Sequence, residues 1–270
     1  MRGNRRQKEE TDKKTKANKA QHYCAGYCLD KPHNLFFISP DTIRDDEVIL
    51  RGDTLHHIKR VLRKSSGDTV FLTDGKGTRF SAEITQSSKS NIHARITHTV
   101  HIERMNLINI ELAFVPLKGH KNDFIIEKGT ELGITKFRPF ISRFSVVTHL
   151  SSQKLNRFKK IALSAMLQSQ RYYMPDVVVT RNVRDLIKTF EHFDLVVVAD
   201  RGGTHAVPIN AQSILFIVGP EGGFDQGEIA HMKNGGATML SCGSHRLRSE
   251  TAALCGITKI LTAYSLKEHE

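Results

Sequence analysis

Two glycine-rich loops carry the residue types in this chain that could do chemistry. The apolar run 215–218 ends in Gly219-Pro220-Glu221-Gly222-Gly223, and the run 238–242 ends at Gly243, before a polar segment, 244–251, that leads into an apolar stretch. Glycines carry no side-chain bulk, so main-chain N–H and C=O groups in such loops can approach a bound molecule closely. Either loop alone could be an ordinary turn. The two in succession predict one ligand held mainly by main-chain groups.

The elements that would position these loops form an alternating series in the second part of the chain. In a helix expected at 152–169, apolar residues such as Phe158, Ala162 and Met166 recur on one face. Strands that alternate with helices predict an α/β domain with a largely parallel sheet. We expect strands at 107–115, 136–141, 176–179, 195–199, 215–218 and 238–241, and helices at 122–132, 152–169, 183–190 and 249–263.

Short strands and turns dominate residues 35–101 and predict a small β-barrel. Asp74-Gly75-Lys76-Gly77 is typical of a hairpin turn, because glycine accepts the positive φ that such a turn requires. A helix at 55–62 would bury the apolar residues 55, 58, 61 and 62 and leave Lys59, Arg60 and Arg63 near the solvent. The composition changes near 103–106, so we expect domains at 34–102 and 103–270. The strands expected in the first domain are 35–38, 69–73, 80–85 and 92–100.

Composition and charge indicate a polyanionic partner. The net charge is +12, of which the polar segment 1–33 supplies +5 from nine basic and four acidic residues. We expect that segment to be a disordered extension. Its Cys24 and Cys28, with His22 and His33, lack the paired spacing of a zinc finger. The chain has four cysteines, no apolar run near the roughly 18 residues of a membrane span and no leader peptide, so we expect a soluble protein of a reducing cytoplasm.

The two loops belong to a longer series of motifs, spread over about residues 34 to 266. After Gly219 to Gly223 come Gly243, Leu247, Arg248, Glu250 and Thr251. Upstream lie His57-Ile58-Lys59-Arg60-Val61-Leu62-Arg63, Glu127-Lys128-Gly129-Thr130-Glu131-Leu132-Gly133, and Gln168-Ser169-Gln170-Arg171 followed by Pro175. The series resembles the SPOUT, or trefoil-knot, RNA methyltransferases, and specifically the bacterial enzymes that methylate N3 of a uridine in small-subunit (16S) ribosomal RNA.

The resemblance implies a fold, a cofactor and a substrate. The fold is an N-terminal PUA-like, RNA-binding β-barrel followed by a C-terminal SPOUT α/β trefoil-knot methyltransferase domain, a threading that ordinary topology rules would exclude. The activity is metal-free methyl transfer from S-adenosyl-L-methionine to uridine N3. The partners are 16S rRNA or the small ribosomal subunit and a second copy of the chain, as a homodimer. The implied cofactor-binding residues are Gly219, Pro220, Glu221, Gly222, Gly223, Leu240, Cys242, Gly243, Leu247 and Thr251.

Charged residues at motif positions have candidate catalytic and RNA-binding roles. Arg248 could offset negative charge on the uracil oxygens or contact phosphate. Glu250 could be catalytic, or it could be a favourable dipole partner at the start of the last helix. RNA contact is implied for a set of cations that could equally be solvated surface charges. This set is Lys59, Arg60, Arg63, Lys118, Lys128, Arg143 and Arg171.

The chain departs from the family pattern at two cationic positions. The family often has Ser-Glu-Arg in the segment after the strand at 136–141, whereas this chain has Ser142-Arg143-Phe144, with Phe144 in place of the arginine. In the last motif the Arg-(Ile/Val) pair is His245-Arg246, as if the charge had moved by one residue. Both changes affect groups that could steer the target nucleotide.

Three other interpretations are open. The run 195–199 with Gly202 and Gly203 could begin a dinucleotide-binding or class I methyltransferase fold, but the full Gly-x-Gly-x-x-Gly is missing, so we expect a turn there. A non-catalytic RNA-binding or ribosome-assembly protein would explain the charge without the intact glycine loop. A SPOUT methyltransferase acting on another RNA base is the third. Cys242 and Cys255 are expected to be inert thiols, because transfer to nitrogen needs no nucleophilic cysteine.

Overall fold

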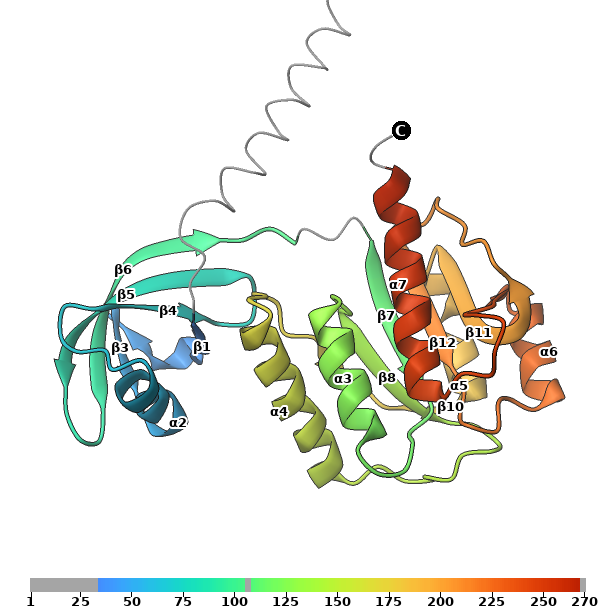
Figure 1. Cartoon of the computed structure of the whole chain (residues 1–270), viewed down its shortest axis with the longest axis horizontal. Helices are drawn as coiled ribbons and strands as arrows, with labels where there is room; N and C mark the ends of the chain where they lie inside the picture. The colour runs from blue at the N-terminus through green and yellow to red at the C-terminus, as the bar shows by residue number, and fades with distance from the viewer. Residues whose placement is uncertain (1–33, 105–107, 268–270) are drawn as a thin grey trace, which may run out of the picture.

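The computed structural model describes residues 34–104 and 108–267 and contains two sheets (Figure 1). The predicted extension 1–33 lies outside the described residues. The first sheet has the strand order β1-β4-β5-β6-β3-β2, with β1 parallel to β4 and the other neighbours antiparallel. Its strands are β1 Leu35–Phe37, β2 Ile43–Arg44, β3 Glu47–Leu50, β4 Thr69–Thr73, β5 Thr78–Ser87 and β6 Ile92–His101.

A short helix covers the apolar core of this first sheet. It runs through α2, Gly52–His56, and continues as a wide turn, η2, His57–Val61; a further short turn, η1, spans Pro40–Thr42. The apolar face predicted at 55–62 is wrong at Val61, which is 62% exposed, while Ile58 is fully buried. The N–H of Leu62 donates to the carbonyl of His57, five residues back, so the helix is wider here than the 3.6-residue period assumes.

The second sheet is parallel throughout, as the alternating pattern predicts. Its order is β10-β8-β7-β12-β11-β13, with β9 also pairing with β8. The predicted strand at 136–141 is confirmed as β8, Lys136–Ile141. The other strands are β7 Asn109–Phe114, β9 Asp176–Val177, β10 Thr180–Asn182, β11 Leu195–Thr204, β12 Ser213–Val218 and β13 Thr238–Leu240.

Helices cover both faces of this parallel sheet. Buried residues of α3, α4 and α7 share one core with Leu112 and Phe216, and those of α5 and α6 share another with Ala113 and Leu215. Figure 1 shows α3, α4 and α7 on the same side, with α4 nearest the first sheet. The helices are α3 Lys121–Glu131, α4 Ser152–Gln168, α5 Val183–Ile187, α6 Gln226–Asn234 and α7 Ser249–Lys267, with a short turn η3 at Phe190–His192.

Strand β11 differs from its sequence prediction in a way that matters for the site. The strand continues to Thr204, but Ala199 and Thr204 both pair with Leu240 of β13. Residues 200–203 therefore form a bulge between these two pairings, where the sequence predicts a turn. Gly203 lets the chain come close to β13 again, because a Cβ there would lie 2.5 Å from the main-chain carbon of Met239.

The two sheets are connected through the turn between β4 and β5. The carbonyl of Gly75 accepts from the N–H of Met174 at 2.8 Å, and the N–H of Gly77 donates to the carbonyl of Tyr172 at 2.8 Å. Tyr173 Oη donates to the Ile102 carbonyl at 2.9 Å. In the described residues we find no helix with the length and apolar character needed to cross a membrane.

Candidate functional site

Three neighbouring strands of the parallel sheet end around one pocket of about 330 Å³. β12, β11 and β13 lie side by side, and the pocket is lined by the residues at and beyond their carboxyl ends. This is the edge at which open parallel sheets bind ligands. The lining residues are Ala199, Asp200, Arg201, Val218, Gly219, Pro220, Glu221, Gly222, Gly223, Phe224, Cys242, Gly243, His245, Arg246, Leu247, Ser249 and Ala252.

The loop after β12 uses its glycines for different reasons. A Cβ at Gly219 would lie 3.0 Å from the ring of Phe224, so packing within the loop requires glycine there. Gly223 has a φ of +75° and donates its N–H to the carbonyl of Pro220 at 2.9 Å, which closes a tight turn. A Cβ at Gly222 would meet only Phe144 Cβ, at an ordinary 3.7 Å. The protein's own packing therefore does not require glycine at 222.

The loop after β13 is joined to the first loop and to α7. Arg246 Nη2 donates to the carbonyl of Glu221 at 3.0 Å. Lys259 Nζ, from α7, donates to the carbonyl of Ser241 at 2.8 Å, and Cys255 Sγ donates to that of Cys242 at 3.2 Å. The two glycine loops and the start of the last helix therefore hold one another in place.

The two acidic side chains that line the pocket, Glu221 and Asp200, both accept hydrogen bonds. Glu221 bonds to Lys121 at 2.8 Å; that hydrogen bond holds the pKa of Glu221 below its ordinary value, and the charge of Lys118 adds to the effect. Asp200 Oδ1 accepts from the N–H of Gly202 at 2.8 Å. Burial raises the pKa of the Cys242 thiol to about 11, and the neighbouring Cys255 adds to this shift. Cys242 is thus a neutral thiol near neutral pH and not a nucleophile.

The predicted cofactor-binding residues are largely, but not all, at this pocket. Gly219, Pro220, Glu221, Gly222, Gly223, Cys242, Gly243 and Leu247 line it. Leu240 is the last residue of β13 and is buried in the core, two residues before Cys242, which lines the pocket. Thr251 lies on a different face of α7, in a hollow that it shares with Leu254 and Thr258.

Neither predicted catalytic residue lines the pocket. Arg248 is exposed, and its carbonyl accepts from the N–H of Ala252 at 2.8 Å in the first turn of α7. Glu250 lies at the predicted helix start, and its Oε2 is buried without a hydrogen-bond partner among the described residues. A buried carboxylate oxygen normally has a donor, so Glu250 Oε2 can accept a hydrogen bond from a group beyond the described residues.

The cations predicted to contact RNA are spread over four places. Lys118 follows β7 close to Glu221, and Arg143 bonds to Asp225 at 2.7 Å beside the loop after β12. Lys128 bonds to Glu127 and Glu131 on α3. On the first domain's helix, Lys59 donates to the carbonyl of Ser88, while Arg60 and Arg63 are exposed.

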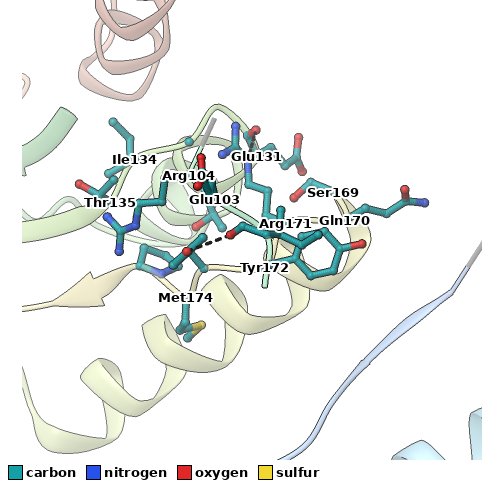
Figure 2. Close-up of a pocket in the computed structure, with 15 residues that line it drawn as sticks. Glu103, Arg104, Glu131, Ile134, Thr135, Ser169, Gln170, Arg171, Tyr172 and Met174 are labelled. Carbon is teal, nitrogen blue, oxygen red and sulfur yellow. Dashed lines mark hydrogen bonds between the residues drawn. The ribbon is translucent and has the colours of Figure 1, made fainter. Parts of the chain in front are cut away.

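Arg171 lies in a separate crevice where the two sheets meet. Figure 2 shows this crevice, with Arg104, Glu131 and Arg171 among the side chains around it. Arg171 Nε donates to the carbonyl of Glu131 at 3.0 Å. A Cβ at Gly133 would lie only 2.7 Å from the guanidinium of Arg171. In this position Arg171 holds the end of α3 in place.

Several pocket residues were not predicted from the sequence. Asp200 and Arg201 belong to β11, whose continuation beyond residue 199 we expected to be a turn. Phe224 stacks on the buried Phe140, with ring centroids 6.2 Å apart, and forms one wall. The sequence pattern identifies Arg246 only as a displaced charge. An arginine three residues after Gly243 is, however, a recognisable indication of contact with a ligand or with a neighbouring loop. The others are Ala199, Val218, His245, Ser249 and Ala252.

This arrangement can hold a small molecule by main-chain groups between two mutually braced loops. Exposed N–H and C=O groups at such loops suit the polar edge of a nucleobase. Among the described residues, no group of three or more His, Cys, Asp or Glu side chains is placed to hold a metal ion.

Comparison with known proteins identifies both parts of the chain. Residues 103–261 match the family described as RNA methyltransferase domain, and residues 50–97 match that described as RNA methyltransferase PUA domain. Ribosomal RNA small subunit methyltransferase E of Bacillus subtilis is 30% identical over 225 residues, which are 78% of this chain and 88% of that protein.

Two solved structures share the whole architecture. One is a ribosomal RNA small subunit methyltransferase E from Neisseria gonorrhoeae bound to S-adenosyl methionine, with a TM-score of 0.75 at 26% identity, covering 86% of this chain and 98% of that one. The other is a probable rRNA-methyltransferase from Porphyromonas gingivalis, with a TM-score of 0.75 at 28% identity, covering 87% and 99%.

Proposed function

The chain belongs to the ribosomal RNA small subunit methyltransferase E family, and on that premise we propose that it transfers a methyl group from S-adenosylmethionine to N3 of a uridine in small-subunit (16S) rRNA. It is an S-adenosylmethionine-dependent rRNA methyltransferase with a PUA-like first domain and a SPOUT-type second domain. The observation that carries the finer proposal is the pocket at the ends of β12, β11 and β13, where the two family motifs meet.

The residues of this pocket fit the cofactor. Gly222 lines the pocket although no packing contact requires glycine there, and a Cβ at Gly243 would meet nothing within 4 Å. Gly243 also has a φ of +158°, which residues with side chains rarely adopt, so only the glycine at 222 is left to be explained by close approach of a ligand to the main chain. We assign the adenosyl moiety to the loops 219–223 and 242–247, with Leu240 and Thr251 supporting the pocket from outside its lining.

The protein contributes orientation and electrostatics to the transfer. S-adenosylmethionine supplies the electrophilic methyl group on a sulfonium, and the methyl passes to N3 of uracil as N3 loses its proton. Holding the nucleophile and the methyl group in line is the main task of the loops. The guanidinium of Arg246 at the pocket, and that of Arg248 at its margin, would offset the negative charge that develops on the uracil oxygens.

The test is methylation of RNA by the full chain, followed by nucleoside mass spectrometry. Small ribosomal subunits and free 16S rRNA from cells that lack this gene are incubated with S-adenosylmethionine and the protein. We expect N3-methyluridine with wild type and none with Gly222→Val, which should fold normally but obstruct the cofactor. Ala230→Val, on the exposed side of α6 and outside the pocket, is the control and should stay active. A different methylated nucleoside would reassign the target base, and binding without methylation would favour the non-catalytic interpretation.

We propose that the active form is a homodimer joined at α7. The face of α7 beside the segment 205–207 is a largely apolar hollow that contains Leu254, Thr258 and Ala263, and no described element covers it. Cys255 belongs to this hollow and also bonds to Cys242 in the cofactor pocket, so the two sites are back to back. A second copy seated there could also supply the donor that Glu250 Oε2 lacks.

Thr258→Arg tests the dimer, because it places a charge in the hollow. We expect a monomer by light scattering and a cofactor dissociation constant raised at least tenfold. Ala230→Arg, on the exposed side of α6, is the charge-matched control and should leave both unchanged. A Thr258→Arg monomer with wild-type cofactor affinity would separate dimerisation from cofactor binding.

The remaining assignments follow from the family. We place the domain boundary at residues 102 and 103, with Lys59, Arg60 and Arg63 of the first domain contacting rRNA phosphates. Lys118 and Arg143 would contact RNA beside the pocket, and Lys128 and Arg171 at greater distance from it. A cytoplasmic location is expected for an enzyme that acts on the small ribosomal subunit.

A further inference from the structure

Phe144 is a large exposed aromatic side chain beside Gly222, a residue of the cofactor pocket, although Phe144 does not itself line that pocket. It follows β8, and 49% of its surface is accessible. Its Cβ is the nearest protein atom to the position that a Cβ would occupy on Gly222, at 3.7 Å. An exposed aromatic residue that adjoins a ligand-binding loop needs an explanation other than core packing.

The turn that carries Phe144 is held by hydrogen bonds on both sides. The N–H of Ser142 donates to Ser145 Oγ at 2.8 Å, and the N–H of Ser145 donates to the carbonyl of Ser142 at 3.1 Å. Arg143 donates its N–H to Glu228 at 2.8 Å and its guanidinium to Asp225 at 2.7 Å. Asp225 and Glu228 are themselves the capping box of α6. The ring is therefore presented from a fixed backbone, at little entropic cost for a binding partner.

The same turn separates two hollows. On one side lies the cofactor pocket with Gly222, and on the other a groove of about 680 Å³ between the end of β8, α5 and α6. The groove has an apolar floor that includes Ile141 and Ile187, and four of its residues can carry positive charge against one acidic residue, Glu228. The four are Arg143, Arg184, Lys188 and His231. Arg143 and Lys188 are ion-paired with Asp225 and Asp185, so the groove offers the backbone of a polyanion less net positive charge than its lining residues alone suggest.

We infer that Phe144 stacks on a nucleobase of the RNA substrate and so positions the target uridine at the cofactor pocket. The inference rests on the proposed function for the identity of the substrate. Every base has a π face, and a base stacked on an aromatic side chain gains enough for a roughly five- to hundredfold change in affinity.

The experiment separates stacking from simple apolar contact. Affinity for a single-stranded, uridine-containing RNA is measured by fluorescence anisotropy, and KM and kcat by methyl transfer to small ribosomal subunits. We expect Phe144→Ala to weaken RNA affinity and raise KM about tenfold, with a smaller change in kcat and an unchanged dissociation constant for S-adenosylmethionine. Phe144→Tyr should restore RNA affinity, whereas Phe144→Leu, apolar but not planar, should behave like Phe144→Ala. Val146→Ala, an exposed apolar residue two positions further on, is the matched control.

Three results would overturn the inference. These are an RNA affinity of Phe144→Ala within twofold of wild type, equal rescue by leucine and tyrosine, or a loss of RNA affinity that accompanies a changed oligomeric state. If wild type proved unable to methylate RNA while Phe144→Ala still weakened RNA binding and tyrosine restored it, the proposed activity would fail and the stacking role would stand.

Discussion

Arg246 connects the two glycine loops through its bond to the carbonyl of Glu221, and it lines the pocket. We predict that Arg246→Ala weakens S-adenosylmethionine binding by about fivefold, the equivalent of about 1 kcal/mol for one lost charge-assisted hydrogen bond at a partly solvated site. Arg248→Ala, outside the lining, should leave cofactor affinity near wild type and lower kcat. Titration calorimetry and single-turnover kinetics measure the two effects. The opposite pattern would assign the contact with the cofactor to Arg248 and the effect on kcat to Arg246.

Cys242 should be unreactive although it lines the pocket. With its pKa raised to about 11 by burial, only about one molecule in a thousand carries the thiolate at pH 8. Below the pKa, the fraction of Cys242 in the thiolate form rises tenfold per pH unit. The rate at which iodoacetamide alkylates Cys242 should therefore keep increasing up to at least pH 10. Peptide-resolved mass spectrometry at several pH values measures this, with glutathione as an ordinary thiol for comparison. A rate that levels off near pH 9 would contradict the raised pKa.

At the residue scale, local sequence predicts glycine loops better than it predicts the charges around them. Gly219 to Gly223 could be placed because a glycine cluster after an apolar run is a local pattern. Asp200 could not, because it reaches the pocket only when β11 lies beside β12 and β13 in the sheet. Thr251 occupies the position expected from the motif. Its place on α7, however, turns it toward the hollow that contains Leu254 and Thr258 and away from the pocket.

Among the elements, α7 depends on one close approach to the sheet. A Cβ at Gly256 would lie 2.0 Å from the ring of Phe216, so the helix can pack on β12 only with glycine there. We predict that Gly256→Ala costs about 1–3 kcal/mol of unfolding free energy from overpacking, or roughly 2–12 °C in Tm. Calorimetry measures it, and Phe216→Leu in the same chain should recover part of the loss. An unchanged Tm would mean that α7 can shift without cost.

Length alone does not separate the elements that sequence predicted correctly from those it missed. β8 and β4 match their predicted bounds, and the three-residue strands β1 and β13 were also predicted. β2 and β10 were missed because two or three residues with at most one apolar side chain give no periodicity, and β3 was missed despite its three consecutive apolar residues. α6 was missed although Asp225 and Glu228 form a capping box, a pattern that can be recognised in sequence.

For the whole molecule, the relation between the two domains depends on Tyr173. A Cβ at Gly77 would lie 2.3 Å from Tyr173 Oη, which itself donates to the Ile102 carbonyl, while Arg104 lies over the ring at 4.5 Å. If the first domain binds rRNA and the second methylates it, the junction fixes the distance between the bound RNA and the pocket. A loosened junction should therefore reduce productive binding of RNA and leave cofactor binding alone.

Gly77→Ala tests this coupling, because the added methyl group must displace the tyrosine ring. We expect kcat/KM for small ribosomal subunits to fall about tenfold, with an unchanged dissociation constant for S-adenosylmethionine and faster hydrogen exchange at residues 172–174. Tyr173→Phe removes only the hydroxyl bond, about 0.5–1.5 kcal/mol, and should give a smaller fall in the same direction. Equal losses of RNA and cofactor affinity would show instead that the junction stabilises the methyltransferase domain itself, since its Tyr172 and Met174 contribute the main-chain bonds to the β4–β5 turn.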